Sequence, residues 1–404
     1  MRSYDPYQQN VRRFRLSEVF IDQYRDKEVP WGPLGYITYK RTYARRLDEF
    51  EPGVNGTEEW YQTCRRVIEG MFTIQKKHVA ALGLEWFDTK AQRTAKEAYD
   101  RLFNLKWTPP GRGLWMMGTK FVEERTGAGL FNCSFRSTRE IDTKGGYLFR
   151  WIMDALMLGV GVGFDTLGAD KITIREPEWS DETWFVPDDR EGWCESVQIL
   201  LDGYFFGQRV PKFDYSQIRP YGAPIKGFGG TSSGHGPLKE LHDNLTELYN
   251  NMIGKEIDST TIVDTENLIG KCVVAGNVRR SAALALGAYN DMEYLSMKND
   301  EEKLYSHRWG SNNSFHAHVG MDYTWHAEQS QKNGEPGYIW LDNARTRGRM
   351  KDGYRDDDIN VAGFNPCVEQ QLEDAELCCL VETFPAKHDD YEDYLKTLKI
   401  AYMY

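Results

Sequence analysis

The sequence predicts an α/β protein in which a mainly helical N-terminal domain, residues 1–110, precedes an α/β region, residues 111–404. Two observations lead to this prediction. Between residues 58 and 105, apolar side chains recur at spacings of three and four, as they do in amphipathic helices. After the helix-breaking segment WTPPGRG, short apolar runs of strand length alternate with apolar helices and glycine-rich turns.

The composition excludes several classes of protein. The 404 residues are 40% hydrophobic and 27% charged, and no apolar run approaches the roughly 20 residues of a membrane span. The N-terminal segment lacks the apolar centre of a secretory signal, and the net charge of −11 argues against non-specific nucleic-acid binding. Seven scattered cysteines without a CxxC pair favour buried or redox-active thiols in a reducing cytoplasm over a disulfide framework or a zinc site. We therefore expect a cytoplasmic protein without a membrane or nucleic-acid partner and without metal ligands.

The α/β region begins with a strand and a glycine-rich turn. LFNCSF is a short apolar run of strand length that contains Cys133. The apolar helix YLFRWIMDALM is followed by Gly159, Gly161 and Gly163 and then by a strand. A dinucleotide fingerprint requires strand, glycines and helix in that order, so this order excludes it. We interpret the glycines as a close approach of the backbone to a ligand.

Residues from about 165 to 217 are predicted to form an insertion, because charge and proline content rise before a further helix at 190–208. A glycine- and serine-rich loop with Arg219 follows, and clustered amides with a cation suit a phosphate as well as they suit an ordinary surface loop. Helices are expected at 241–254 and 260–276. Arg279 and Arg280 are then adjacent in an otherwise uncharged loop, where guanidinium groups favour phosphate or base edges.

The last third of the chain is predicted to contain short strands, a basic loop and a terminal helix. SAALALG and SHRWGSNNSF are predicted to contain strands, and NGEPGYIWLDNARTRGRM to form a turn, a strand and a basic loop. The final segment, YEDYLKTLKIAYMY, has the apolar periodicity of an amphipathic helix.

The stretch Asn365-Pro366-Cys367-Val368-Glu369 carries the strongest indication of chemistry. Pro366 disfavours a helix, and in an extended or looped segment Asn365, Cys367 and Glu369 would face one small volume. An amide, a thiol and a carboxylate at one point suit proton and hydrogen-atom chemistry on a polar substrate. Taken alone, the same residues also fit a buried cysteine beside an ordinary Asn-Pro turn.

Several motifs together resemble the adenosylcobalamin-dependent ribonucleotide reductases, most closely the monomeric ribonucleoside-triphosphate reductases. WGPLGYITYKRTYAR, GVGVGF, IRPYGAPIKGFGG, GKCVVAGNVRRSA, HRWGSNNS, NGEPG and NPCVEQQL…ELCCL occur in the order of that family and cover most of residues 30–385. The resemblance implies one half of a ten-stranded α/β barrel, with a finger loop at about 362–380 running through its centre.

The resemblance also implies a role for each reacting residue. Cys367 would lose a hydrogen atom to a radical generated from adenosylcobalamin and would then abstract the 3′ hydrogen of the ribose. Glu369 would act as general base on the 3′ hydroxyl, and Asn365 would bind the substrate hydroxyls. Cys133 and Cys378 would reduce the substrate and end as a disulfide. Cys379 stands where the family usually has Asn, so exchange between the two vicinal thiols is an open alternative.

Further expectations concern the ligands. By resemblance, Thr119, Gly161, Gly163 and Asn365 would bind a ribonucleoside triphosphate. A deoxynucleotide effector would contact the region 149–163, the insertion and the loop at about 275–282, and the candidate contacts are Asp154, Arg219, Arg279 and Arg280. Thioredoxin or a similar reductant would restore the dithiol.

The family chain continues for roughly a further domain that holds most cobalamin contacts. We therefore expect these 404 residues to need a C-terminal half, whether the sequence is a fragment or is completed by a second polypeptide. The main alternative is a non-catalytic deoxynucleotide-binding regulatory fragment, although such a remnant would not need all five reaction residues. Iron- or glycyl-radical reductases fit the motif series less well, and the absence of CxxC disfavours a simple thiol oxidoreductase.

Overall fold

The computed structural model describes residues 11–50, 52–225, 230–275, 281–348 and 358–404, in two compact units. The first unit contains residues up to Leu130 together with Cys379–Tyr404, and the second contains Phe131–Cys378. Among the described helices, none combines the length and the apolar character needed to cross a membrane.

The first unit is mainly helical. Its two longest helices, α3 (Trp60–Ala81) and α4 (Asp88–Phe103), confirm the amphipathic helices predicted between residues 58 and 105. The strand β1 (Trp107–Thr108) pairs antiparallel with β12 (Glu382–Thr383), which joins the C-terminal segment to this unit. The unit also contains residues 111–130. Its other α-helices are α1 (Glu18–Asp22), α2 (Pro33–Thr42), α5 (Gly111–Met116), α6 (Lys120–Glu124) and α16 (Tyr391–Ala401).

The second unit is built on a six-stranded sheet in the order β11-β2-β3-β6-β7-β8. The five strands from β2 to β8 in this order run parallel, and β11 pairs antiparallel with β2. The strands confirm the runs predicted around LFNCSF, GVGVGF, SAALALG and SNNSF. They are β2 (Cys133–Arg136), β3 (Gly161–Asp165), β6 (Ala283–Ala288), β7 (Asn312–His316), β8 (Gly337–Ile339) and β11 (Leu377–Cys378).

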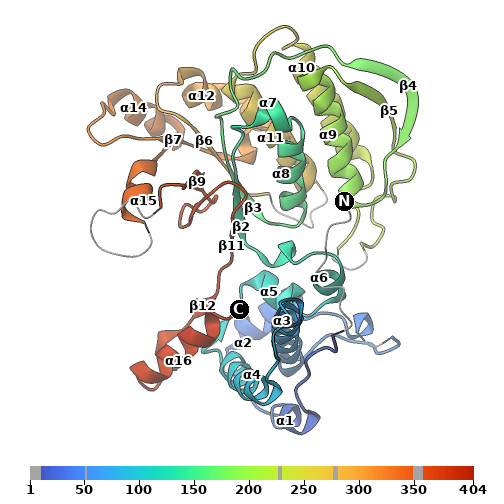
Figure 1. Ribbon diagram of the computed structural model, residues 1–404, viewed down its shortest axis with the longest axis vertical. Coiled ribbons are helices and arrows are strands. Elements are labelled where there is room, and N and C mark those ends of the chain that lie inside the picture. Colours follow the sequence, from blue (N-terminus) through green and yellow to red (C-terminus); the bar gives the residue numbers. More distant parts are fainter. Residues whose placement is uncertain (1–10, 51, 226–229, 276–280, 349–357) are drawn as a thin grey trace. The chain divides into compact units, whose positions relative to one another are not determined.

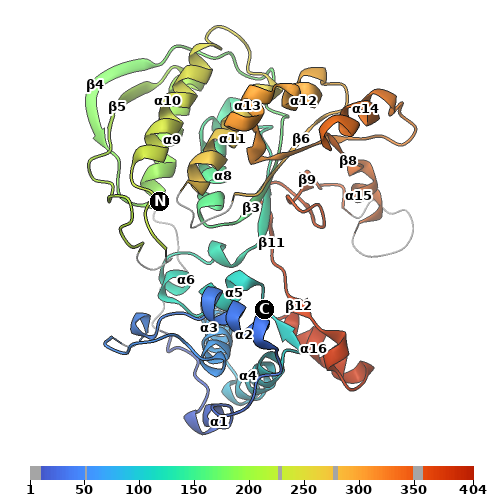
Figure 2. The same cartoon turned by 180° about the vertical axis from the view of Figure 1, so that it is seen from behind.

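Helices cover one face of this sheet, and a short hairpin lies on the other (Figures 1 and 2). The helices α8 (Tyr147–Met157) and α11 (Ser259–Val274) contact the strands and are buried along most of their length, as is expected for helices packed between a sheet and further helices. The hairpin consists of β9 (Gly363–Phe364) and β10 (Gln371–Leu372). The other covering helices are α9 (Arg190–Phe206) and α10 (Gly236–Asn250).

The predicted insertion contains a two-stranded parallel ribbon, β4 (Glu178–Phe185) with β5 (Arg209–Asp214), connected by α9. The helix α9 begins at an N-cap, Asp189, whose side chain accepts a hydrogen bond from Gly192 N, and it ends at Gly207 in the left-handed region with φ of +70°.

The basic loop predicted after NGEPGYIWL is instead a helix, α15 (Leu341–Arg347). Leu341 is buried and Ala344 half-buried, so this short segment has an inward face that its high charge obscured. The unit's remaining short helices are α7 (Ile141–Lys144), α12 (Met292–Ser296), α13 (Glu301–Ser306) and α14 (Thr324–Asn333).

The hairpin approaches the sheet at Gly161 and Gly163 of β3, which have no side chains. Gly161 and Gly163 project to the same face of the strand, because residues two apart do so. A Cβ atom built on Gly163 would lie 1.8 Å from the carbonyl oxygen of Phe364, and one on Gly161 would lie 3.2 Å from Pro366. Gly363 in turn lies against the ring of Phe135. A Cβ atom built on Gly363 would lie 2.1 Å from that ring. The glycines therefore admit the backbone of the hairpin itself.

A small apolar core completes this contact. Phe135, Leu284, Leu286, Ile339 and Leu372 are all at most 4% exposed, and Ala362 and Phe364 pack against them. Burial of this cluster holds the hairpin on the sheet.

The close contact predicts the effect of one added methyl group. We expect Gly163→Ala to lower the free energy of unfolding by about 1–3 kcal/mol, because the backbone of Phe364 must move to admit the Cβ atom. Urea denaturation followed by circular dichroism measures this change. Gly236→Ala is the matched control, because a Cβ atom there meets nothing within 4 Å. Equal stability of the two variants would show that the hairpin is not held at this contact.

A buried acidic residue on α11 introduces a dependence on pH. Glu266 is 0% exposed, and neither of its carboxylate oxygens has a hydrogen-bond partner among the described residues. Burial raises the pKa of Glu266 from 4.5 to about 8, although the charge of Lys298 opposes the shift. Between these two values the folded protein keeps a proton that the unfolded chain has lost, so stability falls as pH rises from about 4.5 to about 8.

Glu266→Gln should remove this dependence. At pH 8 we expect its Tm to exceed that of the unchanged protein by at least about 2–4 °C, the shift that roughly 1 kcal/mol produces in a domain of this size. At pH 5 the two Tm values should be close, because the buried carboxyl group is then neutral. Scanning calorimetry at both pH values measures this difference in Tm, with the exposed Glu247→Gln as control. A difference in Tm that is the same at both pH values would contradict the raised pKa of Glu266.

Candidate functional site

A tight turn at Asn365–Val368 carries the predicted reactive cysteine. The backbone N–H of Val368 donates to the carbonyl oxygen of Asn365 at 3.0 Å, and Pro366 occupies the second position of the turn, which proline favours. Asn365 is 0% exposed and holds the loop twice: its N–H donates to Gln370 O at 3.1 Å, and its Oδ1 accepts from Gln370 N at 3.0 Å. One buried amide thus fixes the geometry of the turn.

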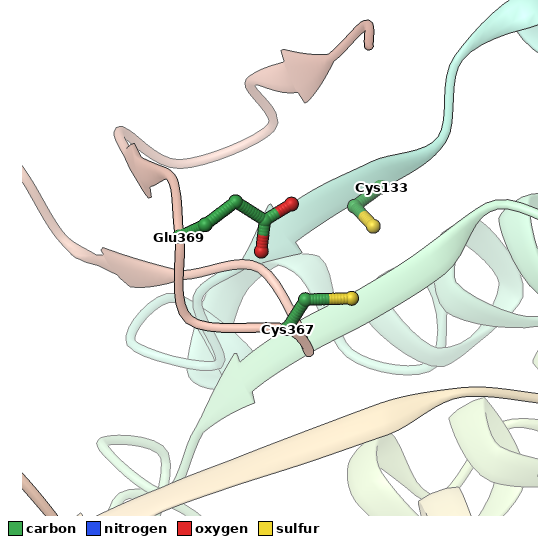
Figure 3. A group of neighbouring side chains, drawn as sticks. All are labelled: Cys133, Cys367 and Glu369. Carbon is green, nitrogen blue, oxygen red and sulfur yellow. The ribbon is translucent and has the colours of Figure 1, made fainter. Parts of the chain in front are cut away.

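The turn brings three reactive groups together (Figure 3). Cys367 and Glu369 project from the turn, and Cys133 projects from β2. Their Sγ and carboxylate oxygen atoms all lie within 4.8 Å of one another. The side chain of Asn365 donates from Nδ2 to Glu369 Oε1 at 2.8 Å. The predicted common volume for Asn365, Cys367 and Glu369 is therefore present, and a turn rather than an extended strand produces it.

A second thiol lies beside Cys133. In the antiparallel pairing of β11 with β2, Cys378 is directly opposite Cys133, and both are buried. Residues directly opposite across a sheet have Cα atoms about 4.5–5.5 Å apart, which a disulfide can span. Cys379 is exposed and belongs to the first unit, so the register favours Cys378 as the partner of Cys133. The strand β11 is held further by Asp374, which pairs with Arg136 at 3.0 Å and accepts from Ser137 N at 2.8 Å.

The surroundings keep these thiols protonated. Hydrogen bonding to Cys378 and burial raise the pKa of Cys133, and Asn365 opposes the shift. Burial, followed by the nearby Cys133 and Glu369, raises the pKa of Cys367. A protonated thiol retains an S–H hydrogen that a radical can remove, whereas a thiolate is the better nucleophile. The site is therefore suited to hydrogen-atom transfer.

Two thiols and a carboxylate could also be metal ligands. Cys133, Cys367 and Glu369 have the donor atoms that a divalent metal such as zinc accepts. Cysteine binds a metal as thiolate, however, and the raised pKa values of both thiols oppose that form. A thiol bound to a metal loses its proton, so these pKa directions describe the site without a metal.

The predicted substrate residues have structural contacts of their own. Gly161 and Gly163 lie beneath the hairpin, so at Gly163 the closely approaching group is the chain's own backbone. Thr119 belongs to the first unit, where its hydroxyl donates to Met116 O at 2.8 Å and accepts from Val122 N at 3.5 Å as the N-cap of α6. Their roles toward a substrate stay predictions.

Two of the predicted effector residues are joined to one segment. Asp154 pairs with Arg190 at 2.8 Å, and Arg219 pairs with Asp188 at 2.7 Å. Arg219 also donates to Pro224 O and Asp188 O. Burial raises the pKa of Asp154, and Arg190 opposes the shift. Arg279 and Arg280 lie outside the described residues.

Sequence reasoning missed the residues that pack the hairpin and the following loop against the sheet. Phe135 and Gly363 make a second close contact between sheet and hairpin, and Asp374 ties the following loop to Arg136. A glycine directly before an apolar residue in VAGFNPC is a usable signal for such a contact, but only once the facing strand is known.

Comparison with known proteins finds similarity to ribonucleotide reductases. The model of the ribonucleotide reductase alpha domain matches residues 16–119, and that of the B12-dependent ribonucleotide reductase insertion domain matches residues 166–249. The crystal structure of a B-12 dependent (class II) ribonucleotide reductase superposes with a TM-score of 0.81 at 32% identity, covering 96% of this chain and 62% of that one.

Curated relatives give the same result over nearly the whole chain. A probable adenosylcobalamin-dependent ribonucleoside-triphosphate reductase of Dictyostelium discoideum is 46% identical over 98% of this chain and 55% of its own length. The adenosylcobalamin-dependent ribonucleoside-triphosphate reductase of Euglena gracilis is 44% identical over 99% of this chain and 55% of its own. That of Lactobacillus leichmannii is 37% identical, over 92% and 57% respectively. The chain spans about half the length of the relatives it matches.

The paired strands predict one preferred disulfide. Under mild oxidation we expect Cys133 and Cys378 to cross-link, because they are directly opposite in β2 and β11. Mass spectrometry of a non-reduced digest identifies the linked peptides. Cys379→Ser should leave the cross-link in place and Cys378→Ser should abolish it. A dominant Cys378–Cys379 linkage would contradict the register.

Proposed function

Since the chain belongs, over the length it spans, to the adenosylcobalamin-dependent ribonucleotide reductases, we propose that it forms the thiol-bearing half of a ribonucleoside-triphosphate reductase. The observation that carries the proposal is the meeting of Cys367, Glu369 and Cys133 within 4.8 Å, with Asn365 and Cys378 in contact with members of the group. These are the five residues whose roles the family resemblance implies.

Cys367 is the hydrogen-transfer residue in this proposal. Its thiol is exposed on the turn and its raised pKa keeps the S–H bond intact, which fits a partner that removes a hydrogen atom. Adenosylcobalamin, when bound, supplies the radical chemistry for that removal. The sulfur of Cys367 then takes the 3′ hydrogen atom of the ribose and returns it after the reduction.

In this proposal Glu369 accepts a proton, and Asn365 orients Glu369. The carboxylate of Glu369, held by Asn365 Nδ2 at 2.8 Å, accepts the proton of the 3′ hydroxyl. Glu369 is exposed on the turn, so it can reach a substrate hydroxyl while Asn365 stays buried.

Cys133 and Cys378 provide the two reducing equivalents. The 2′ hydroxyl leaves as water after it gains a proton from the dithiol, and the two sulfurs lose two electrons and one further proton as they form a disulfide. The sum is a ribonucleotide and two thiols giving a deoxyribonucleotide, water and a disulfide. Thioredoxin or a similar dithiol then restores the thiols.

The larger assembly is part of the same proposal. The five parallel strands would make one half of a ten-stranded barrel, residues 362–380 its finger loop and residues 111–404 its first part, after a helical domain at 1–110. Thr119, Gly161, Gly163 and Asn365 would bind a ribonucleoside triphosphate. A C-terminal half, on the same or a second polypeptide, would complete the barrel and hold most of the cobalamin.

A deoxynucleotide effector would bind near the insertion at about 165–217. Support comes from the ion pairs of Asp154 and Arg219, which both join the segment Asp188–Arg190 at the start of α9. An anionic ligand that competes with Asp188 for Arg219 would change this network. Arg279 and Arg280 are the further candidate contacts.

Reconstitution tests the catalytic proposal. With adenosylcobalamin, a ribonucleoside triphosphate, a dithiol, an effector and a C-terminal half, we expect deoxynucleotide by chromatography, and none without that half. Cys367→Ala should reduce the rate at least about 10³-fold, because no other group can transfer the hydrogen atom. Cys194→Ala, a buried cysteine on α9, is the matched control. Deoxynucleotide binding without turnover in the complete mixture would favour a regulatory fragment.

A further inference from the structure

Two thiols and a carboxylate converge on one point from two distant segments of the chain. Cys133 projects from β2, and Cys367 and Glu369 project from the turn after β9, so that their sulfur and oxygen atoms face one another (Figure 3). The three donor atoms all lie within 4.8 Å of one another. Within the described part of the chain, no other group of three or more His, Cys, Asp or Glu side chains is gathered in this way. The reaction steps proposed above use these atoms in turn, whereas their common focus also suits a single ion.

The separations are close to those around one tetrahedral ion. With zinc–sulfur bonds of about 2.3 Å and zinc–oxygen bonds of about 2.1 Å, the ligand atoms of a tetrahedral zinc lie roughly 3.6–3.8 Å apart. The donor atoms therefore need to approach one another by at most about 1 Å. Cys367 and Glu369 are exposed, so rotation of their side chains provides this movement without any change in the packing of the core.

Asn365 holds two of these groups from behind. Its Nδ2 donates to Glu369 Oε1 at 2.8 Å, which leaves Oε2 of the same carboxylate for an ion. Hydrogen bonding to Cys378 and burial raise the pKa of Cys133, and a hydrogen bond with Asn365 opposes them. Ligands in metal sites are usually oriented by outer hydrogen bonds of this kind. Because Asn365 is 0% exposed and bound to the backbone of the loop, it presents both groups from a fixed position.

The donor set selects the kind of ion. Magnesium and calcium are bound by oxygen ligands, whereas two sulfur donors select thiophilic cations such as Zn²⁺. Three protein ligands leave the fourth tetrahedral position to water or another exchangeable ligand. The sequence predicted no metal ligands because it contains no CxxC pair, and the spacing of Cys133 from Cys367 is far outside any pattern that would have revealed them.

We infer that Cys133, Cys367 and Glu369, with both thiols reduced, form a binding site for one Zn²⁺ ion. Binding breaks the two S–H bonds, the two protons pass to solvent, and no electron is transferred. The site itself stands on the geometry. Its effect on turnover rests on the proposed function: a metal-bound Cys367 has no S–H hydrogen to give, so the ion reversibly inhibits the reductase.

The ion and the active-site disulfide exclude each other. A Cys133 sulfur that is bonded to Cys378 is no longer a thiolate, so the oxidised site has lost one of its three ligands. Zinc thus binds the dithiol state and is released when Cys133 and Cys378 are oxidised.

Absorption spectroscopy of the purified chain with Co²⁺ tests the inference without turnover. Cobalt accepts the ligands that zinc accepts, and its bond to a thiolate gives a charge-transfer band in the near ultraviolet. A phosphine keeps the thiols reduced in place of a dithiol, which would compete for the metal. We expect the band to appear on titration with Co²⁺ and to disappear when Zn²⁺ displaces it. Prior oxidation of Cys133 with Cys378 should prevent its appearance.

Variants of the three ligands identify the site. Cys133→Ser and Cys367→Ser should each diminish the band and weaken Co²⁺ binding at least about tenfold, and Glu369→Gln should weaken binding by a similar factor while the thiolate band remains at saturation. Cys379→Ser and Glu392→Gln, two exposed residues of the same types, are the matched controls and should change neither.

Two results would overturn the inference. One is the absence of the band at saturating Co²⁺. The other is a band and an affinity that both survive Cys367→Ser and Glu369→Gln while circular dichroism shows the variants folded. These two residues are exposed, so their substitution tests the site even if the buried Cys133→Ser variant does not fold.

Turnover distinguishes this inference from the reductase proposal. In the complete mixture, with thioredoxin as the reductant, a buffered concentration of free Zn²⁺ that saturates the site should lower the rate at least about tenfold, and chelation by EDTA should restore it. If the reductase proposal fails, the Co²⁺ band persists without turnover in that mixture. If the metal site fails, turnover is insensitive to Zn²⁺ and the chain gives no band.

Discussion

The position of the reactive turn depends on one steric constraint: on β3 there is room for hydrogen but not for a methyl group. Because the carbonyl of Phe364 lies where a Cβ atom of Gly163 would be, the hairpin can pack its backbone directly on the sheet. Phe135 and Gly363 repeat the contact on the neighbouring strand. A rigid parallel sheet thus sets the height of the turn above it, and so the distance from Cys367 to Cys133.

Polar contacts then set the chemical state of that turn. Asn365 is buried, and its side chain is shared between the backbone of the loop and the carboxylate of Glu369. Burial disfavours a negative charge on Cys367, and the hydrogen bond with Cys378 followed by burial disfavours one on Cys133; the same carboxylate acts in the same direction on both thiols. One amide therefore orients the carboxylate, and the carboxylate in turn helps keep both neighbouring sulfurs protonated.

Much of this arrangement could be predicted from the sequence, because local patterns decide local structure. The periodic helices α3, α4, α9 and α11 and the strand at Cys133 were predictable in this way. Resemblance, not spacing, paired Cys133 with Cys378, since a contact between residues so distant in sequence has no local signal. The helix α15 was missed because its charged residues outnumber the two residues that face inward, Leu341 and Ala344. The contact of the hairpin with the glycines of β3 could not be predicted, because the two segments lie about two hundred residues apart in the chain.

The strand β11 occupies the outer end of the described sheet order and consists of two residues. Cys378 sits on this strand and is only 4% exposed. When its sulfur is bonded to Cys133, the strand is covalently attached to β2, and an attacking thiolate must approach along the sheet edge. Short terminal strands open locally at small free-energy cost. Fraying of β11 would then control the rate at which a disulfide between Cys133 and Cys378 is reduced, independently of the chemistry at the turn.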